Sequence, residues 1–136
     1  MVGALLLTPT LAACGSSTEA APAPTTSASQ PAAPVRVGVA EWIPVAQSPG
    51  TVIIDVRTPE EFNSGHVQGA LNIPVESPDF AQQVAALDPG TTYAVYCRSG
   101  NRSAVAVAEM GSMGYAHLYD LEGGFADLEA AGLPTA

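Results

Sequence analysis

Short apolar runs that alternate with helix-start signals are the feature that most constrains how this chain can fold. From Val35 onward, each apolar run of strand length is followed by a segment with the signals of a helix. Strands alternating with helices favour a mostly parallel sheet with helices on both faces, so we predict a single α/β domain. The expected strands span residues 35–39, 51–55, 70–74, 92–96 and 117–119, and the expected helices residues 41–47, 58–65, 77–88, 103–113 and 125–131.

Particular residues mark these elements. Thr58 is expected to cap a helix that has Pro59 at its first position and Glu61 in a capping box. Pro44 falls inside the first helix, which it should keep short or irregular. Residues 51–55 are a continuous apolar run that ends in an acid, the pattern of a central strand buried on both faces.

Composition divides the 136 residues into three parts. Residues 1–14 hold an apolar stretch too short for a membrane-spanning helix, which needs about 20 residues. Residues 15–34 are small and polar residues, prolines and one acid, which cannot bury enough apolar surface to fold and should form an extended tether. Residues 35–136 have the length of one small domain, which we expect to be monomeric.

The first part ends in Leu11-Ala12-Ala13-Cys14-Gly15, which resembles the lipobox of bacterial lipoproteins. The resemblance implies a signal peptide, lipidation of Cys14, export, and a lipid anchor on the outer face of the bacterial cell membrane. A signal peptide ordinarily begins with positive charge, and no Lys or Arg precedes Arg36, so we expect the natural start to lie upstream. The alternative is an apolar tail with an incidental cysteine.

Charge excludes one class of partner. The chain has no lysine, and four arginines against thirteen acids give a net charge of -9, which argues against nucleic-acid binding. Two of the four arginines, Arg98 and Arg102, lie beside Cys97 and make a local cationic spot.

Cys97 follows an expected strand and opens the loop Cys97-Arg98-Ser99-Gly100-Asn101-Arg102, which leads into a helix. Ligands bind at the carboxyl ends of parallel strands. Backbone N–H groups that enter a helix lower the pKa of a thiol and bind anions, and Gly100 can take the positive φ of a tight loop. We therefore predict that Cys97 is a reactive nucleophile in a site that is not apolar, and not an inert buried cysteine.

Other polar residues have more ordinary interpretations. Asp55 and Arg57 end a strand and are expected to form a supporting ion pair more than to act in chemistry. His66 could anchor a loop, and two isolated histidines, His66 and His117, do not make a metal site, so no metal or cofactor is predicted. Trp42 is expected in the core.

Three segments in order carry a resemblance to a known family. Residues 55–74, from Asp55-Val56-Arg57 to Ile73-Pro74, resemble the first signature of rhodanese domains, residues 96–103 resemble the active-site loop, and residues 121–134 are similar to the carboxy-terminal motif. Together they cover about residues 35–134. The resemblance implies a single rhodanese-like α/β domain in which Cys97 carries sulfur, held by the amides of its loop. Leu128 stands where the family often has tryptophan, a change expected to affect packing.

The loop favours sulfur over phosphate. Only four residues separate Cys97 from Arg102, one fewer than in the related cysteine phosphatases, so the cradle suits one sulfur atom better than a tetrahedral oxyanion. We predict that Cys97 takes sulfur from a small anionic donor such as thiosulfate, forms a persulfide and passes the sulfur to cyanide or a thiol. Arg98 and Arg102 would orient the donor. The alternatives are a sulfur carrier, sensor or protein-interaction module without turnover and, less favoured, an arsenate reductase or phosphatase.

Overall fold

The computed structural model describes residues 33–136. The predicted signal segment with Cys14, and all of the tether except Ala33 and Pro34, lie outside the described residues. Pro34 is half-buried and packs over Gly111, so the last tether residue touches the domain.

Five strands form one parallel sheet in the order β1-β5-β4-β2-β3. They are β1 (Val35–Val37), β2 (Val52–Asp55), β3 (Leu71–Asn72), β4 (Thr92–Tyr96) and β5 (His117–Leu121). The predicted parallel α/β architecture is confirmed. β4 occupies the centre of the sheet, and β2, the expected central strand, lies beside it in the interior.

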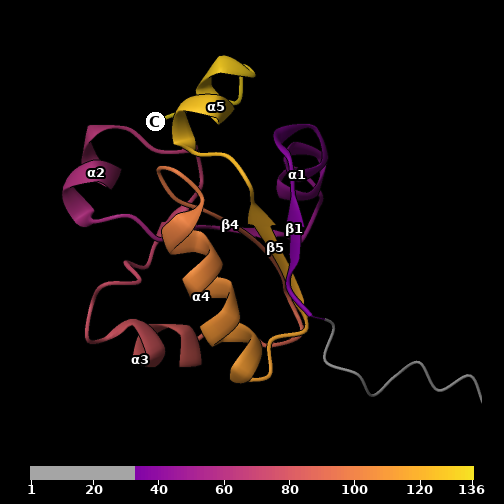
Figure 1. Ribbon diagram of the computed structural model, residues 1–136, viewed down its shortest axis with the longest axis vertical. Coiled ribbons are helices and arrows are strands. Elements are labelled where there is room, and N and C mark those ends of the chain that lie inside the picture. The colour runs from indigo at the N-terminus through magenta and orange to yellow at the C-terminus, as the bar shows by residue number, and fades with distance from the viewer. Residues whose placement is uncertain (1–32) are drawn as a thin grey trace, which may run out of the picture.

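Helices cover both faces of this sheet (Figure 1). The core on one face is built with α3 (Phe80–Ala85) and α4 (Asn101–Ser112), and the core on the other with α1 (Val39–Ala46) and α5 (Phe125–Ala130). The short α2 (Pro59–Ser64) follows β2, and its predicted capping box between Thr58 and Glu61 is present. None of the helices in the described part of the chain is long and apolar enough to cross a membrane.

The two-residue period of β4 decides which way each of its side chains points. Tyr93, Val95 and Cys97 belong to the core under α3 and α4, whereas Ala94 and Tyr96 belong to the core under α1 and α5. The four strand residues of this apolar run are buried, and so is Cys97, which follows them. The strand therefore delivers Cys97 beneath the start of α4.

Several expected boundaries differ from the structure: β1 and α3 are shorter than expected, and β5 is longer. β3 has only two residues, because it lies at the sheet edge and pairs with β2 over two positions before Pro74 interrupts it. α4 begins at Asn101, two residues earlier than predicted, directly after Gly100 turns the chain. α1 begins at Val39, two residues earlier than expected, and is short, as Pro44 predicted. Pro44 is exposed, so water can replace the missing backbone hydrogen bond.

Candidate active site

The loop after β4 turns sharply at Gly100, which has the predicted positive φ, 86°. A Cβ on Gly100 would lie 2.7 Å from the carbonyl oxygen of Glu122 and 2.8 Å from Nη2 of Arg36. Glycine is therefore required here both by backbone conformation and by space. The turn brings the N–H of Gly100 back toward the cysteine three residues earlier.

The sulfur of Cys97 is the centre of the polar contacts inside this loop. The backbone N–H of Gly100 donates to Sγ at 3.0 Å, and Oγ of Ser103 lies 3.6 Å from Sγ. Ser103 is itself fully buried in the first turn of α4, and its hydroxyl donates to the carbonyl of Gly100 at 3.3 Å. The sulfur thus has one amide donor and one hydroxyl within reach.

These contacts change the acidity of the thiol. Burial by itself raises the pKa of Cys97, but hydrogen bonds from the backbone and hydroxyl of Ser103 and from the amides of Ser99 and Gly100 outweigh it, so the pKa is lowered. A lowered pKa increases the fraction of thiolate, which is the nucleophilic form. The loop is therefore built to favour a sulfur anion.

One expectation about this thiol needs correction. We expected Cys97 to lie outside an apolar site, but its exposed fraction is 0% and its side chain packs within the apolar core under α4. The reason is the alternation along β4, which continues one residue past the strand and turns Cys97 inward. The polar character of the site comes from the loop backbone and Ser103, on one side of the sulfur only.

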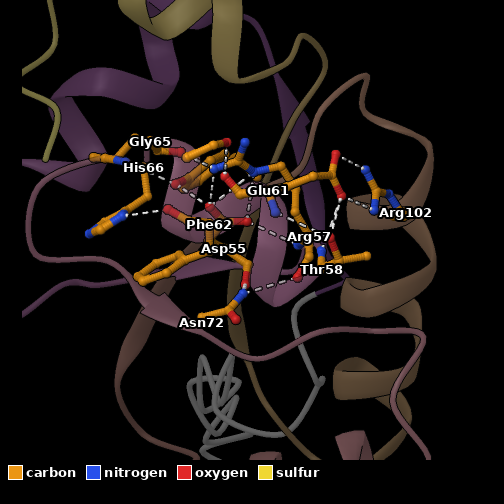
Figure 2. A network of polar contacts seen from close by, with 12 residues as sticks. Asp55, Arg57, Thr58, Glu61, Phe62, Gly65, His66, Asn72 and Arg102 are labelled. Carbon is orange, nitrogen blue, oxygen red and sulfur yellow. Dashed lines mark hydrogen bonds and ion pairs between the residues drawn. The ribbon is translucent and has the colours of Figure 1, made fainter.

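The two loop arginines differ in their partners. Arg102 donates to both carboxylate oxygens of Glu61 at 2.7 and 2.9 Å (Figure 2). A carboxylate oxygen of Glu76 lies 3.9 Å from Nη1 of Arg102. Arg98 is exposed and forms no ion pair with any residue of 33–136. The predicted cationic spot is therefore partly neutralised, and Arg98 is the arginine that remains open to an anion.

Glu61 connects the start of α2 to the active-site loop. Its carboxylate accepts from the backbone N–H of Thr58 and from Arg102. The hydrogen bond from Arg102 is the main reason that the pKa of Glu61 falls from its ordinary value of 4.5 to about 2. The sequence assigned Glu61 to helix capping alone.

The double glycine before α5 supports the loop from behind. A Cβ on Gly124 would lie only 1.7 Å from the carbonyl oxygen of Arg98, so the two backbones touch directly. The N–H of Phe125 donates to the carbonyl of Cys97 at 2.9 Å. The carboxy-terminal motif thus meets the active-site loop through backbone contacts that any side chain at Gly124 would block.

A buried ion pair lies next to the loop, as expected for Asp55 and Arg57. Arg57 donates to the Asp55 carboxylate, at 2.6 Å for its shortest contact (Figure 2). The hydroxyl of Tyr96 donates to the same carboxylate at 2.6 Å. Burial lowers the pKa of Arg57, but its hydrogen bond and charge interaction with Asp55 outweigh burial, so the pKa is raised. The guanidinium carbon of Arg57 also lies over the Phe125 ring, 4.4 Å from its centroid. Both charged groups are hydrogen-bonded to each other and to neighbouring residues, which favours a structural role for the pair over a role in the reaction.

Neither histidine gathers metal ligands. Nδ1 of His66 is bonded to the carbonyl of Phe62 at 2.8 Å, and its ring stacks on that side chain, so it anchors the turn after α2. Within residues 33–136 no group of three or more His, Cys, Asp or Glu side chains could hold a metal ion.

Sequence reasoning missed three residues near the loop: Ser103 as a partner of the sulfur, and Arg36 and Asp120, which meet beside Gly100. Ser103 carried a signal, because a serine in the first turn of a helix after a cysteine loop can face back toward the loop. Arg36 and Asp120 carried none, since 84 positions separate them.

Comparison with known proteins places these features in a family. A family model described as the Rhodanese-like domain matches residues 40–131. Thiosulfate sulfurtransferase 16 of Arabidopsis thaliana is 37% identical, over 60% of this chain and 77% of that protein. Thiosulfate sulfurtransferase PspE of Escherichia coli is 40% identical, over 55% of this chain and 71% of that protein. The solved structure of a rhodanese-related protein from Thermoplasma volcanium superposes with a TM-score of 0.65 at 27% identity, over 75% and 97% of the two chains.

Proposed function

Because this chain belongs to the rhodanese-like domain family, we propose that it is a sulfurtransferase that moves sulfane sulfur through a persulfide on Cys97. The donor would be thiosulfate or a similar small anion, and the acceptor cyanide or a thiol. The single observation that carries the proposal is the 3.0 Å contact between the N–H of Gly100 and Sγ, in a loop that lowers the pKa of the thiol.

The proposed reaction has two half-reactions. The Cys97 thiolate attacks the outer sulfur of thiosulfate, a new S–S bond forms, the bond inside thiosulfate breaks, and sulfite leaves with the electron pair. Cyanide then attacks the outer sulfur of the persulfide, thiocyanate leaves, and the thiolate returns. Two steps through a covalent intermediate predict ping-pong kinetics.

Four of the loop residues, Arg98, Ser99, Gly100 and Arg102, have a proposed part in this scheme. The amides of Ser99 and Gly100 stabilise the anionic sulfur, as they do the thiolate. Arg98, which is exposed, binds the negatively charged donor. Arg102, held by Glu61, contributes charge from the first turn of α4, where Asn101 also lies.

Two further points support sulfur over phosphate chemistry. The relatives PspE and sulfurtransferase 16 carry the name thiosulfate sulfurtransferase. In this chain the Gly100 N–H already occupies the space next to Sγ, at 3.0 Å, so the loop closes around one sulfur atom.

The test replaces Cys97 with serine in the full chain. We expect Cys97→Ser to lose thiosulfate:cyanide sulfur transfer completely and to gain no mass after incubation with thiosulfate, whereas the wild type gains about one sulfur atom. Cys14→Ser is the matched control, because it removes the other cysteine and should keep full activity. Transfer by Cys97→Ser would overturn the proposal.

The same measurements separate the alternatives. A stable persulfide without turnover would indicate a sulfur carrier or sensor, and the absence of both would indicate an interaction module. Hydrolysis of an aryl phosphate or reduction of arsenate would indicate the phosphatase-like alternative.

For location, we propose that the chain is exported and anchored by a lipid on Cys14. The support is the sequence Leu11-Ala12-Ala13-Cys14-Gly15 and the apolar segment before it. Segment 15–34, whose composition predicts an extended tether, would then hold the domain away from the membrane surface.

A further inference from the structure

A second ion pair lies on the other side of the Cys97 loop. Arg36 of β1 and Asp120 of β5 are register partners on neighbouring strands, and Nη1 of Arg36 donates to Oδ2 of Asp120 at 2.6 Å. Asp120 is 2% exposed, whereas the side chain of Arg36 is 42% exposed. The carboxylate is therefore the fixed partner, and it determines where the guanidinium lies.

The guanidinium held in this way also contacts the active-site loop. Nη1 of Arg36 donates to the carbonyl of Gly100 at 3.2 Å, and Nη2 lies 3.4 Å from the carbonyl of Glu122. Nη2 would be only 2.8 Å from a Cβ on Gly100, so the guanidinium packs directly against this residue. Gly100 is the residue whose N–H reaches Sγ.

We propose that Arg36, oriented by Asp120, is a positioning residue for Cys97: it holds Gly100 so that the Gly100 N–H stays directed at the sulfur. Neither residue touches the sulfur. The inference rests on the proposed function, in which a sulfur anion on Cys97 is the reacting species.

A purely structural explanation accounts for less of the geometry. β1 and β5 are already joined by backbone pairing, which the N–H of Glu122 extends by donating to Val37. The ion pair is not needed to attach the strand. It also leaves Oδ1 of Asp120 buried without a hydrogen bond, and burial raises the pKa of this carboxyl although the neighbouring Ser103 hydroxyl and Arg36 act to lower it. A role of Arg36 in positioning the loop explains why Asp120 holds the guanidinium on the side that faces Gly100.

The contact with Gly100 has a consequence for Ser103. The carbonyl of Gly100 accepts from both Arg36 and Ser103, and the Ser103 hydroxyl has a single proton. If that hydroxyl turns toward an anionic Cys97, 3.6 Å away, the Gly100 carbonyl still keeps Arg36 as its donor. Gly100 is the N-cap of α4, so its carbonyl also accepts the first hydrogen bond of the helix, and Ser103 can serve the sulfur without leaving this carbonyl unpaired.

The charge of Asp120 and its role in orienting Arg36 predict opposite shifts of the Cys97 pKa in the Asp120→Asn variant. The charged groups that face the loop come from the loop and α4, from α2, from the end of β2, and from β1 and β5. They are Arg98, Arg102, Glu61, Asp55, Arg57, Arg36 and Asp120. Asp120→Asn removes a negative charge, which alone would lower the pKa of Cys97. If Asp120 acts by orienting Arg36, the loosened loop instead raises that pKa.

The experiment measures the pH dependence of Cys97 alkylation by iodoacetamide in the Cys14→Ser background, where Cys97 is the only thiol. We expect Arg36→Gln to move the midpoint of the profile up by about one pH unit, a tenfold change in acidity, and Asp120→Asn to move it up by less. Arg36→Lys should recover part of the shift, since it keeps the charge without the planar fork. The rate of sulfur transfer should fall most in Arg36→Gln and less in Asp120→Asn and Arg36→Lys.

Asp79→Asn is the matched control for Asp120→Asn, because Asp79 is exposed and its side chain caps nothing. An unchanged profile in a folded Arg36→Gln, or a lower midpoint in Asp120→Asn, would overturn the inference. If Arg36→Gln does not fold, the midpoints of the alkylation profiles of Arg36→Lys and Asp120→Asn test the inference instead. Because alkylation needs no turnover, an inactive wild type would refute the proposed function alone.

Discussion

At the scale of single residues, the acidity of Cys97 is set by a few neighbours. The thiol is buried, which raises its pKa, but the backbone and hydroxyl of Ser103 and the amides of Ser99 and Gly100 outweigh that effect. Arg98, the nearest arginine in sequence, is exposed, and among the described residues the hydrogen-bond partners of the sulfur are Gly100 and Ser103. Position along the chain is therefore a poor guide to which residues act on the sulfur.

The pair between Glu61 and Arg102 gives a pH-dependent prediction. Folding lowers the pKa of Glu61 from 4.5 to about 2, so the pair stabilises the fold above pH 4.5 and its contribution is lost as the pH falls through about 2. We expect Glu61→Gln, which keeps an oxygen for the Thr58 cap, to lower the free energy of unfolding at pH 7 by about 1 kcal/mol, since the pair is partly exposed to solvent. Urea unfolding at pH 7 and pH 3 measures the difference in the free energy of unfolding between the variant and the wild type.

Glu60→Gln is the control, because Glu60 is adjacent and exposed. The difference between Glu61→Gln and the wild type should shrink at pH 3, while Glu60→Gln stays close to the wild type throughout. A Glu61→Gln chain as stable as Glu60→Gln at pH 7 would mean that the pair contributes nothing.

At the scale of elements, the segment that follows β5 supports the Cys97 loop, which follows β4. Gly124 and Gly38 make a useful comparison, because both precede helices in extended backbone and neither has a positive φ. A Cβ on Gly124 meets the backbone of Arg98 at 1.7 Å, whereas a Cβ on Gly38 meets the flexible end of Glu41 at 3.2 Å. Only the first contact cannot be relieved by a side-chain movement.

We therefore expect Gly124→Ala to lower the free energy of unfolding by about 3 kcal/mol and to reduce sulfur transfer at least tenfold, because α5 must move away from the loop. Gly38→Ala should change stability by no more than about 0.5 kcal/mol and keep activity. Chemical unfolding and the thiosulfate:cyanide assay measure both effects. Equal effects of the two substitutions would contradict this account of the double glycine.

The elements that the sequence predicted well are those with strong local signals. The Thr58 capping box, the buried run of β4 and the turn at Gly100 all depend on residues close together in the chain. The extent of β3 depends on how far a neighbouring strand pairs with it, and the start of α4 on where the Cys97 loop closes. These are tertiary effects, which local patterns do not contain.

The candidate site was predictable to the same degree. The loop of Cys97 and the pair of Asp55 and Arg57 lie within short segments and could be found from the sequence. The engagement of Arg102 by Glu61 and the meeting of Arg36 with Asp120 join residues 41 and 84 positions apart. Such contacts follow from the order of strands in the sheet, so they needed the folded structure.

At the scale of the whole molecule, the proposed lipid on Cys14 makes a prediction about partitioning. Expressed in bacteria with its natural start, the wild type should collect in the membrane fraction, and its Cys14 should carry a diacylglycerol by mass spectrometry. Cys14→Ser should leave that fraction while keeping sulfur transfer. An unmodified Cys14 in a chain with its natural start would contradict the anchor without affecting the assignment of Cys97.

The pairing of β1 with β5 also bears on when the cysteine becomes reactive. These strands come from opposite ends of the domain, so their contact forms only after almost all of it has been synthesised and has collapsed. In the proposed arrangement Arg36 reaches Gly100 only at that stage. An unfinished or unfolded chain would therefore carry Cys97 as an ordinary thiol, and completion of the fold would switch its reactivity on.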